Sequence, residues 1–221
     1  MVIISGTASG IGYATAVYFL QQGYEVLGID RNPSGIIAPH YHHAVADVRE
    51  AESLPEVEKC EYVISAAGVQ DEKEAIDVNL KGTINLVEKY AFNPAIRSVL
   101  MIASSSAHTG FEFPDYSASK GGVLAYMKNV AWRLAEKYKA TCNSLSFGGV
   151  ITPLNDPVMQ DEKAWQDIMK VTPLKKWMTG KECAEWIYFM TVVNKSCSGQ
   201  DILIDNGEKD LNCTFVWPEG K

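Results

Sequence analysis

Short apolar runs alternate along the chain with longer stretches whose apolar positions recur at helical spacing. The apolar runs predict strands at residues 2–5, 25–29, 62–65, 99–103, 141–145 and 202–204. The longer stretches predict helices at residues 10–22, 74–92, 116–139 and 181–193. Such alternation is typical of a parallel sheet covered by helices on both faces. We therefore expect an α/β protein with a doubly wound parallel sheet in a three-layer α/β/α sandwich.

Residues 152–180 interrupt this alternation. The segment contains three prolines, two tryptophans and several charged residues. We expect it to be an insertion over the carboxyl edge of the sheet, where open α/β sheets bind ligands. No internal repeat or low-complexity linker occurs, so residues 1–221 are predicted to form a single domain.

Composition narrows the range of partners and locations. A net charge of −7 disfavours a broad surface for nucleic acid or anionic membrane, because both require clustered Lys and Arg. The chain enters its first predicted strand at once and has no apolar run of ~18 residues, so we expect a cytoplasmic protein that does not contact membrane. Five widely spaced cysteines without a CxxC pair predict incidental thiols and no metal site.

A glycine-rich turn follows the first predicted strand, with the sequence Gly6-Thr7-Ala8-Ser9-Gly10-Ile11-Gly12. Glycines permit a tight turn and close backbone approach, while free N–H groups at the start of the next helix can hold a pyrophosphate. The same glycines could instead serve backbone geometry alone. The turn therefore needs a second signal before it indicates a dinucleotide site.

Asp30 supplies that second signal at the end of the second predicted strand, about 20 residues after the turn. A carboxylate there can accept hydrogen bonds from the adenosine ribose hydroxyls and repels a 2′-phosphate, so NAD is preferred and NADP is less favoured. Arg31 leaves an alternative open, because a guanidinium could bind a 2′-phosphate if Asp30 pointed away. A solvated surface arginine is its other interpretation.

Tyr116 and Lys120 lie four residues apart on one face of a predicted helix. A phenol titrates near 10, so making it useful near pH 7 requires roughly 4 kcal/mol of phenolate stabilisation. A positive charge about 4 Å away at an effective dielectric of about 20 contributes roughly that amount. Upstream, residues 101–107 form a strand end that runs into serines, whose hydroxyls could meet a substrate oxygen or could cap the turn.

Together these features resemble the short-chain dehydrogenases/reductases over nearly the whole chain, from Val2 to about Asn206. The further matching marks are Asp47-Val48, Ser65-Ala66-Ala67-Gly68, Asn79 within Val78-Asn79-Leu80-Lys81-Gly82, and Gly148-Gly149-Val150-Ile151-Thr152-Pro153. The resemblance implies a Rossmann-type fold and an NAD-dependent enzyme that transfers a hydride between the nicotinamide ring and the carbon of a secondary alcohol or ketone.

The resemblance also implies roles for individual residues. Tyr116 is expected to be the acid/base, Lys120 to bind the nicotinamide ribose and lower the tyrosine pKa, Asn79 to position a water, and Ser104, or else Ser105, to hold the substrate oxygen. The residues expected to bind the cofactor, besides Tyr116 and Lys120, are Gly6, Ser9, Gly10, Ile11, Gly12, Asp30, Asp47, Val48, Ala67, Gly68, Val150 and Thr152.

Three departures from the family pattern bear on these expectations. Ser65-Ala66 stands where the family has two asparagines, and Phe147 stands where it has a proline, which adds an aromatic wall near the substrate. The stretches 47–62 and 68–79 are short, so the helices there are expected to be trimmed and the adenine end to be open.

The substrate is expected to be a small to medium hydrophobic molecule, hydroxysteroid-like or 3-oxoacyl-like. Substrate contacts are predicted for Ser104, His108, Phe147 and Gly148, and His108 could instead be a plain loop residue. The apolar wall is predicted to comprise Phe111, Phe113, Phe147, Leu154, Met159, Trp165, Met169 and Trp177, together with His108, unless half of them only pack the insertion onto the core.

Assembly and competing functions complete the prediction. The resemblance implies a homodimer or homotetramer formed through helices 74–92 and 116–139, with Ala125, Tyr126, Val130, Ala131 and Leu134 as apolar contacts. A sugar-nucleotide epimerase or dehydratase also uses a Tyr-Lys pair but usually has a longer chain with a substrate domain. A non-catalytic dinucleotide-binding sensor or scaffold remains the main alternative.

Overall fold

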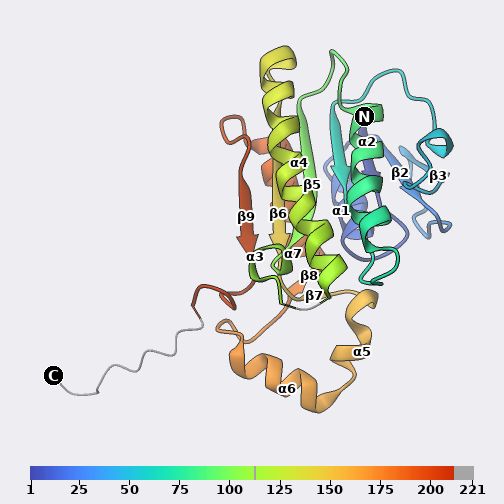
Figure 1. The fold of residues 1–221 in the computed structure, drawn as a ribbon. Coiled ribbons are helices and arrows are strands. Elements are labelled where there is room, and N and C mark those ends of the chain that lie inside the picture. The colour runs from blue at the N-terminus through green and yellow to red at the C-terminus, as the bar shows by residue number, and fades with distance from the viewer. Residues whose placement is uncertain (112, 212–221) are drawn as a thin grey trace.

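The computed structural model describes residues 1–111 and 113–211, and a parallel sheet forms the middle of the molecule (Figure 1). The strands of the sheet lie in the order β3-β2-β1-β4-β5-β6-β9, and every pair is parallel. Their bounds are β1 Val2–Ser5, β2 Val26–Asp30, β3 Tyr41–Val45, β4 Tyr62–Ser65, β5 Ser98–Ser104, β6 Thr141–Phe147 and β9 Asp201–Ile204. A separate two-stranded pair joins β7 Val150–Ile151 to β8 Met178–Thr179.

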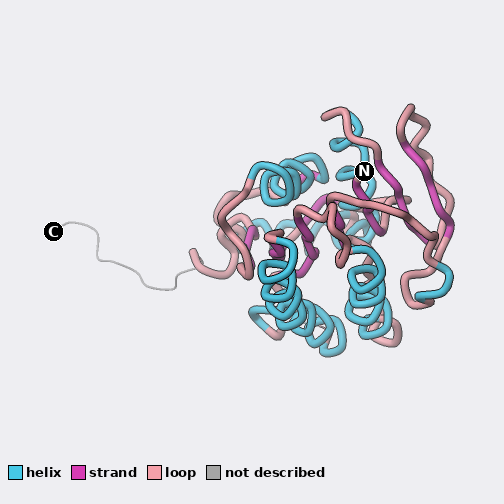
Figure 2. The backbone as a smooth tube through the Cα atoms, turned by 90° about the horizontal axis from the view of Figure 1, so that it is seen from above, coloured by secondary structure: helices cyan, strands magenta, loops and turns pink. Residues whose placement is uncertain are grey.

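Helices cover both faces of the sheet, as the view from above in Figure 2 shows. The helices are α1 Gly10–Gln21, α2 Gly82–Tyr90, α3 Ser106–Thr109, α4 Pro114–Tyr138, α5 Asp156–Met159, α6 Glu162–Val171 and α7 Gly180–Tyr188. Short turns of 3₁₀ helix occur at Ala51–Ser53 and Pro153–Asn155, and π-helical turns at Ile76–Lys81 and Phe189–Val193. The predicted α/β sandwich is confirmed, and none of the described helices is long and apolar enough to cross a membrane.

Two hydrophobic clusters, one on each face, hold the layers together. On one face Leu86 of α2 and Met127 of α4 pack against sheet residues such as Val99. On the other face Phe19 of α1 and Ile187 of α7 complete the second cluster. All five side chains are fully buried. Removing the apolar surface of each from water stabilises the fold by on the order of 2 kcal/mol.

The buried stripe of α4 corrects one sequence expectation about assembly. Val130, Ala131 and Leu134 lie in the cluster beneath α4, with exposures of 0–6%. They therefore cannot supply the apolar contacts predicted for a second subunit, because their side chains already pack within this chain. The large exposed apolar side chain on α4 is Trp132, which is 66% exposed.

The chain order places the ligand-binding edge. Strand order reverses beside β1, where β2 lies on one side and β4 on the other, and crevices form at such a point. The segment 152–180 carries α5, α6 and β8 and lies beyond the carboxyl ends of β6 and β9 in Figure 1. β3 was not predicted, and neither were the short helices of this segment.

Candidate active site

The turn between β1 and α1 depends on glycine. A Cβ on Gly12 would lie 2.1 Å from the Gly6 carbonyl oxygen, and one on Gly6 would lie 2.8 Å from the backbone of Ala67. Gly6 has φ +78 and Gly10 has φ +58, which L side chains rarely adopt. Ser9 caps α1 without a side-chain hydrogen bond, so the first N–H groups of the helix face the cleft without an intrahelical partner. This arrangement suits an anion such as a pyrophosphate.

Asp30 is oriented by two backbone amides at the end of β2. Its Oδ2 accepts a hydrogen bond from the Ala8 N–H at 3.0 Å, and its Oδ1 accepts one from the Asn32 N–H at 2.9 Å. The carboxylate therefore lies beside the glycine turn, on the wall of the cleft. It does not point away, so whether Arg31 reaches a 2′-phosphate depends on what else holds its guanidinium, which contacts Glu74 Oε2 at 3.4 Å.

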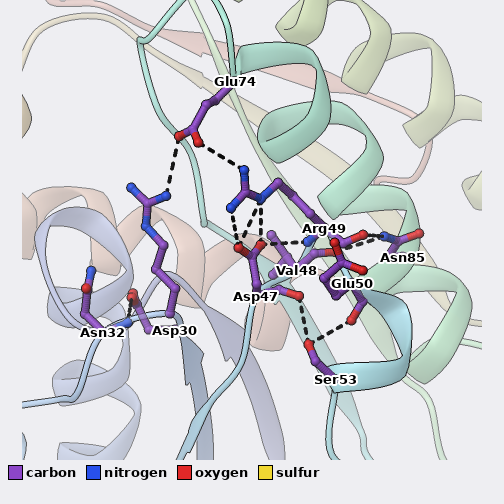
Figure 3. Close-up of polar contacts among 10 residues, drawn as sticks. Asp30, Asn32, Asp47, Val48, Arg49, Glu50, Ser53, Glu74 and Asn85 are labelled. Atoms are coloured by element: carbon purple, nitrogen blue, oxygen red, sulfur yellow. Dashed lines mark hydrogen bonds and ion pairs between the residues drawn. The ribbon is translucent and has the colours of Figure 1, made fainter.

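Asp47 and Val48 also line this end of the cleft, and Asp47 is bound by Arg49 (Figure 3). The Arg49 guanidinium donates to Asp47 Oδ2 at 2.6 Å and to Glu74 Oε1 at 3.0 Å. Hydrogen bonds from Arg49 hold the pKa of Asp47 below its usual range. As expected for short connections, the only helix of the described chain between β3 and β4 is the single turn Ala51–Ser53.

Tyr116 and Lys120 reach the opposite end of the same cleft from the first turns of α4. Lys120 Nζ lies 5.9 Å from the centre of the Tyr116 ring and donates to the Ile102 carbonyl at 2.8 Å. Only 5% of Lys120 is exposed, and this burial lowers its pKa to about 8. The lysine is thus a buried cation next to the phenol at neutral pH.

Ser104 ends β5 and lines the cleft, as Ser105 does. The Ser104 hydroxyl oxygen accepts a hydrogen bond from the Ser106 N–H at 3.2 Å. Both serines considered for the substrate oxygen therefore lie at the cleft, and Ser104 is the more buried of the two.

Asn79 is fully buried behind the residues that line the cleft. Its amide nitrogen donates to the Val69 carbonyl at 2.9 Å and to the Ser119 hydroxyl at 3.0 Å, and its Oδ1 accepts from the Val69 N–H at 2.8 Å. Both amide hydrogens are therefore used within the protein. Asn79 joins the segment after β4 to the turn of α4 that carries Lys120, and only Oδ1 has capacity left for the water expected from the sequence.

The strand ends on the far side complete the cleft, which has a volume of about 1210 Å³. Phe147 pairs with Ser104 across β5 and β6, so its side chain lies beside the serine on the same face of the sheet. Thr152 covers the glycine turn, with its Cγ2 3.6 Å from the position of a Cβ on Gly10. The remaining predicted contacts Ala67, Gly68, Gly148 and Val150 also line the cleft.

The structure does not bring His108 to the cleft, and the predicted substrate contact is corrected accordingly. The His108 Nε2 lies 2.8 Å from Asp201 Oδ2 and 3.1 Å from the Ser146 hydroxyl. Asp201 begins β9, and its carboxylate also accepts from the Ser144 hydroxyl at 2.5 Å. The imidazole therefore fastens α3 to the β6–β9 edge of the sheet and is not among the residues that line the cleft.

The apolar wall differs in part from the expected one. Five of the predicted side chains line it, namely Phe111, Phe113, Phe147, Leu154 and Trp177, while Met159, Trp165 and Met169 do not. Trp165 instead packs edge-on against Trp177, with ring centres 5.0 Å apart. The sequence analysis missed Val158, Ile168 and Val171. The last two are three residues apart on α6, a spacing that could have indicated one apolar face.

The sheet, its switch point and the glycine turn define the class, an α/β protein of the Rossmann type. A family model described as enoyl-(acyl carrier protein) reductase matches residues 57–209. The short chain dehydrogenase adrF of Penicillium roqueforti is 31% identical over 198 residues, which are 74% of this chain and 76% of that protein. The chain therefore belongs to the short-chain dehydrogenase/reductase family, a family of oxidoreductases.

Two solved structures share the fold at lower identity. The 4-hydroxyisoleucine dehydrogenase complexed with NADH has a TM-score of 0.86 at 24% identity, over 94% of this chain and 98% of that chain. A protein from Agrobacterium tumefaciens with bound NADP has a TM-score of 0.84 at 22% identity, over 94% of this chain and 95% of that chain. Because one neighbour holds NADH and the other NADP, these likenesses do not decide between the two cofactors.

Proposed function

We propose that this protein is an NAD(H)-dependent oxidoreductase that interconverts a secondary alcohol and a ketone, with Tyr116 as its acid/base. One observation carries the proposal. A single continuous cleft runs from the glycine turn and Asp30 to Ser104, Tyr116 and Lys120. The residues proposed to hold the pyrophosphate and the ribose therefore share a cavity with the residue proposed to transfer the proton.

The residues present fit a nicotinamide dinucleotide. The turn would take the pyrophosphate through the N–H groups at the start of α1, and Gly6 and Gly12 keep the turn tight because a Cβ on either would clash with backbone atoms. The Asp30 carboxylate would accept hydrogen bonds from the adenosine ribose, and its charge favours NAD because it repels a 2′-phosphate. When bound, the nicotinamide ring supplies or accepts the hydride.

Tyr116 is proposed to take the alcohol proton in one direction and to return it in the other. Lys120 stabilises the phenolate because its charge lies in a water-poor wall. At 5.9 Å from the ring centre, one unit charge at an effective dielectric of about 20 contributes about 3 kcal/mol. Ser104 would hold the substrate oxygen as a hydrogen-bond donor while the proton moves.

The substrate is proposed to be small to medium in size and hydrophobic, a hydroxysteroid-like or 3-oxoacyl-like molecule. Support comes from the aromatic and aliphatic walls contributed by Phe147, Trp177, Ile168 and Val171.

The experiment titrates the protein with NADH, followed by nicotinamide fluorescence, and then measures NAD reduction with a panel of hydrophobic secondary alcohols and hydroxysteroids. We expect saturable NADH binding and turnover of at least one panel member. Binding without turnover of any alcohol, in either direction, would favour a dinucleotide-binding sensor. A protein that bound no dinucleotide would contradict the proposal.

A further inference from the structure

The segments that follow β2, β3 and β4 meet around the Glu74 carboxylate at the adenosine end of the cleft. Glu74, in the turn that precedes the π-helical turn Ile76–Lys81, lies between the segment after β2 and the segment after β3. Its Oε2 contacts the Arg31 guanidinium at 3.4 Å, and its Oε1 accepts from the Arg49 guanidinium at 3.0 Å. Figure 3 shows Glu74 above Arg49 and Asp47, with its two oxygens directed to different partners.

The two arginines are held unequally. Arg49 donates to both oxygens of Asp47 in addition to Glu74, and its side chain is 34% exposed. Within residues 1–111 and 113–211, Arg31 has one ion pair, the long contact to Glu74, and its side chain is 50% exposed. If the Glu74 charge were removed, Arg49 would stay on Asp47 while Arg31 would be released. Arg31 also lines the cleft, next to Asp30, so a released guanidinium is already at the site.

We infer that Glu74 is a specificity-determining positioning residue that withholds Arg31 from a 2′-phosphate and so maintains a preference for NAD(H) over NADP(H). This inference rests on the proposed function, because it concerns the same dinucleotide site. Asp30 acts on the ribose directly, whereas Glu74 acts through Arg31.

The local charge count agrees with this assignment. Asp30, Asp47 and Glu74 oppose Arg31 and Arg49, so these five side chains sum to a charge of −1. A 2′-phosphate would bring about −1.5 to −2 more. Glu74→Gln makes the local sum zero and frees a guanidinium, which binds phosphate oxygens through charge-assisted hydrogen bonds. Because the side chains are partly exposed, the gain is moderate, roughly fivefold to tenfold in NADPH affinity.

The test measures dissociation constants for NADH and NADPH by fluorescence, and for adenosine 2′,5′-bisphosphate and 5′-AMP by calorimetry. The variants are Glu74→Gln, the double variant Glu74→Gln/Arg31→Gln, and Glu136→Gln as a matched control that removes the same charge from the exposed end of α4. We expect Glu74→Gln to tighten NADPH and the bisphosphate roughly fivefold or more, with NADH and 5′-AMP within about twofold of wild type. The double variant should lose the gain, and the control should show none.

Two results overturn the inference alone, and NADH binding in every variant certifies that each is folded. One is an unchanged NADPH affinity in Glu74→Gln, and the other is a gain that persists in the double variant. Failure of every protein to bind NADH, wild type included, would instead contradict the proposed function together with the inference. The two failures are therefore distinguishable.

Discussion

Replacing Lys120 with methionine is expected to change how the stability of the protein depends on pH. Burial lowers the Lys120 pKa from 10.5 to about 8 in the folded protein. A lysine in the unfolded chain titrates near 10.4, so the folded state binds this proton more weakly than the unfolded state does. At 1.36 kcal/mol per pH unit, the difference corresponds to about 3 kcal/mol.

The direction follows from proton linkage. Between pH 8 and pH 10.5 the unfolded chain holds the Lys120 proton and the folded protein does not, so the free energy of unfolding rises with pH over this window. The contribution is complete above about 10.5 and is lost as pH falls to about 8. Methionine removes the titrating group and with it this dependence.

The assay is urea unfolding of wild type and Lys120→Met at pH 7 and pH 10.5. The difference in unfolding free energy, wild type minus variant, should be about 3 kcal/mol larger at the higher pH. Other titrating groups cancel in the difference. Lys128→Met, an exposed position on the same helix, is the control, because that charge stays in water in both states. Equal differences for Lys120→Met at the two pH values would refute the claim that its charge lies in a water-poor wall.

Three further predictions concern the turn, the corrected histidine and assembly. Gly12→Ala should abolish NADH binding, measured by fluorescence, and destabilise the protein by about 1–3 kcal/mol, measured by urea unfolding, because the new Cβ has no space. The control is Gly35→Ala, whose Cβ would meet no atom within 4 Å. It should change neither property. His108→Ala should cost about 1–3 kcal/mol in urea unfolding, because it removes a partner from the Asp201 carboxylate, while NADH affinity stays within twofold; loss of NADH binding would contradict the structural role. We propose a homodimer or homotetramer through α2 and α4, so light scattering should give the mass of a multimer. Trp132 is 66% exposed on α4, and Trp132→Glu should convert the multimer to smaller species. An unchanged mass in this variant would count against this surface.

The elements that pattern alone predicts are those with a clear hydrophobic signal. β1 and β4 match their predicted bounds because each is a run of four fully buried residues that ends at turn-forming sequence. The sequence analysis did not predict β3, because it is an edge strand that is half exposed and has two histidines among its five residues. An edge strand is partly open to solvent, so its apolar and polar residues need not alternate regularly enough for the pattern to be detected from the sequence.

The residues of the candidate site likewise fall into those that the sequence could place and those that it could not. Gly6 and Asp30 could be placed from the sequence because each lies at the end of a predicted strand, and Tyr116 because it precedes Lys120 by four residues. The structure brings all three to one cleft. The partners of His108 could not, because Asp201 is 93 residues away in sequence and meets it only when β9 joins the sheet. Glu74 was missed for the same reason, since its contacts with Arg31 span 43 residues.

The central claim is that Tyr116 transfers the proton in a nicotinamide-dependent alcohol oxidation. The most direct measurement compares NAD reduction by wild type and Tyr116→Phe with an alcohol that wild type turns over, while NADH affinity is measured in parallel. The account predicts that turnover in Tyr116→Phe falls by a factor of 10² to 10⁴, the contribution typical of an acid/base group, with NADH affinity little changed. Turnover within tenfold of wild type in Tyr116→Phe, with NADH still bound, would contradict it.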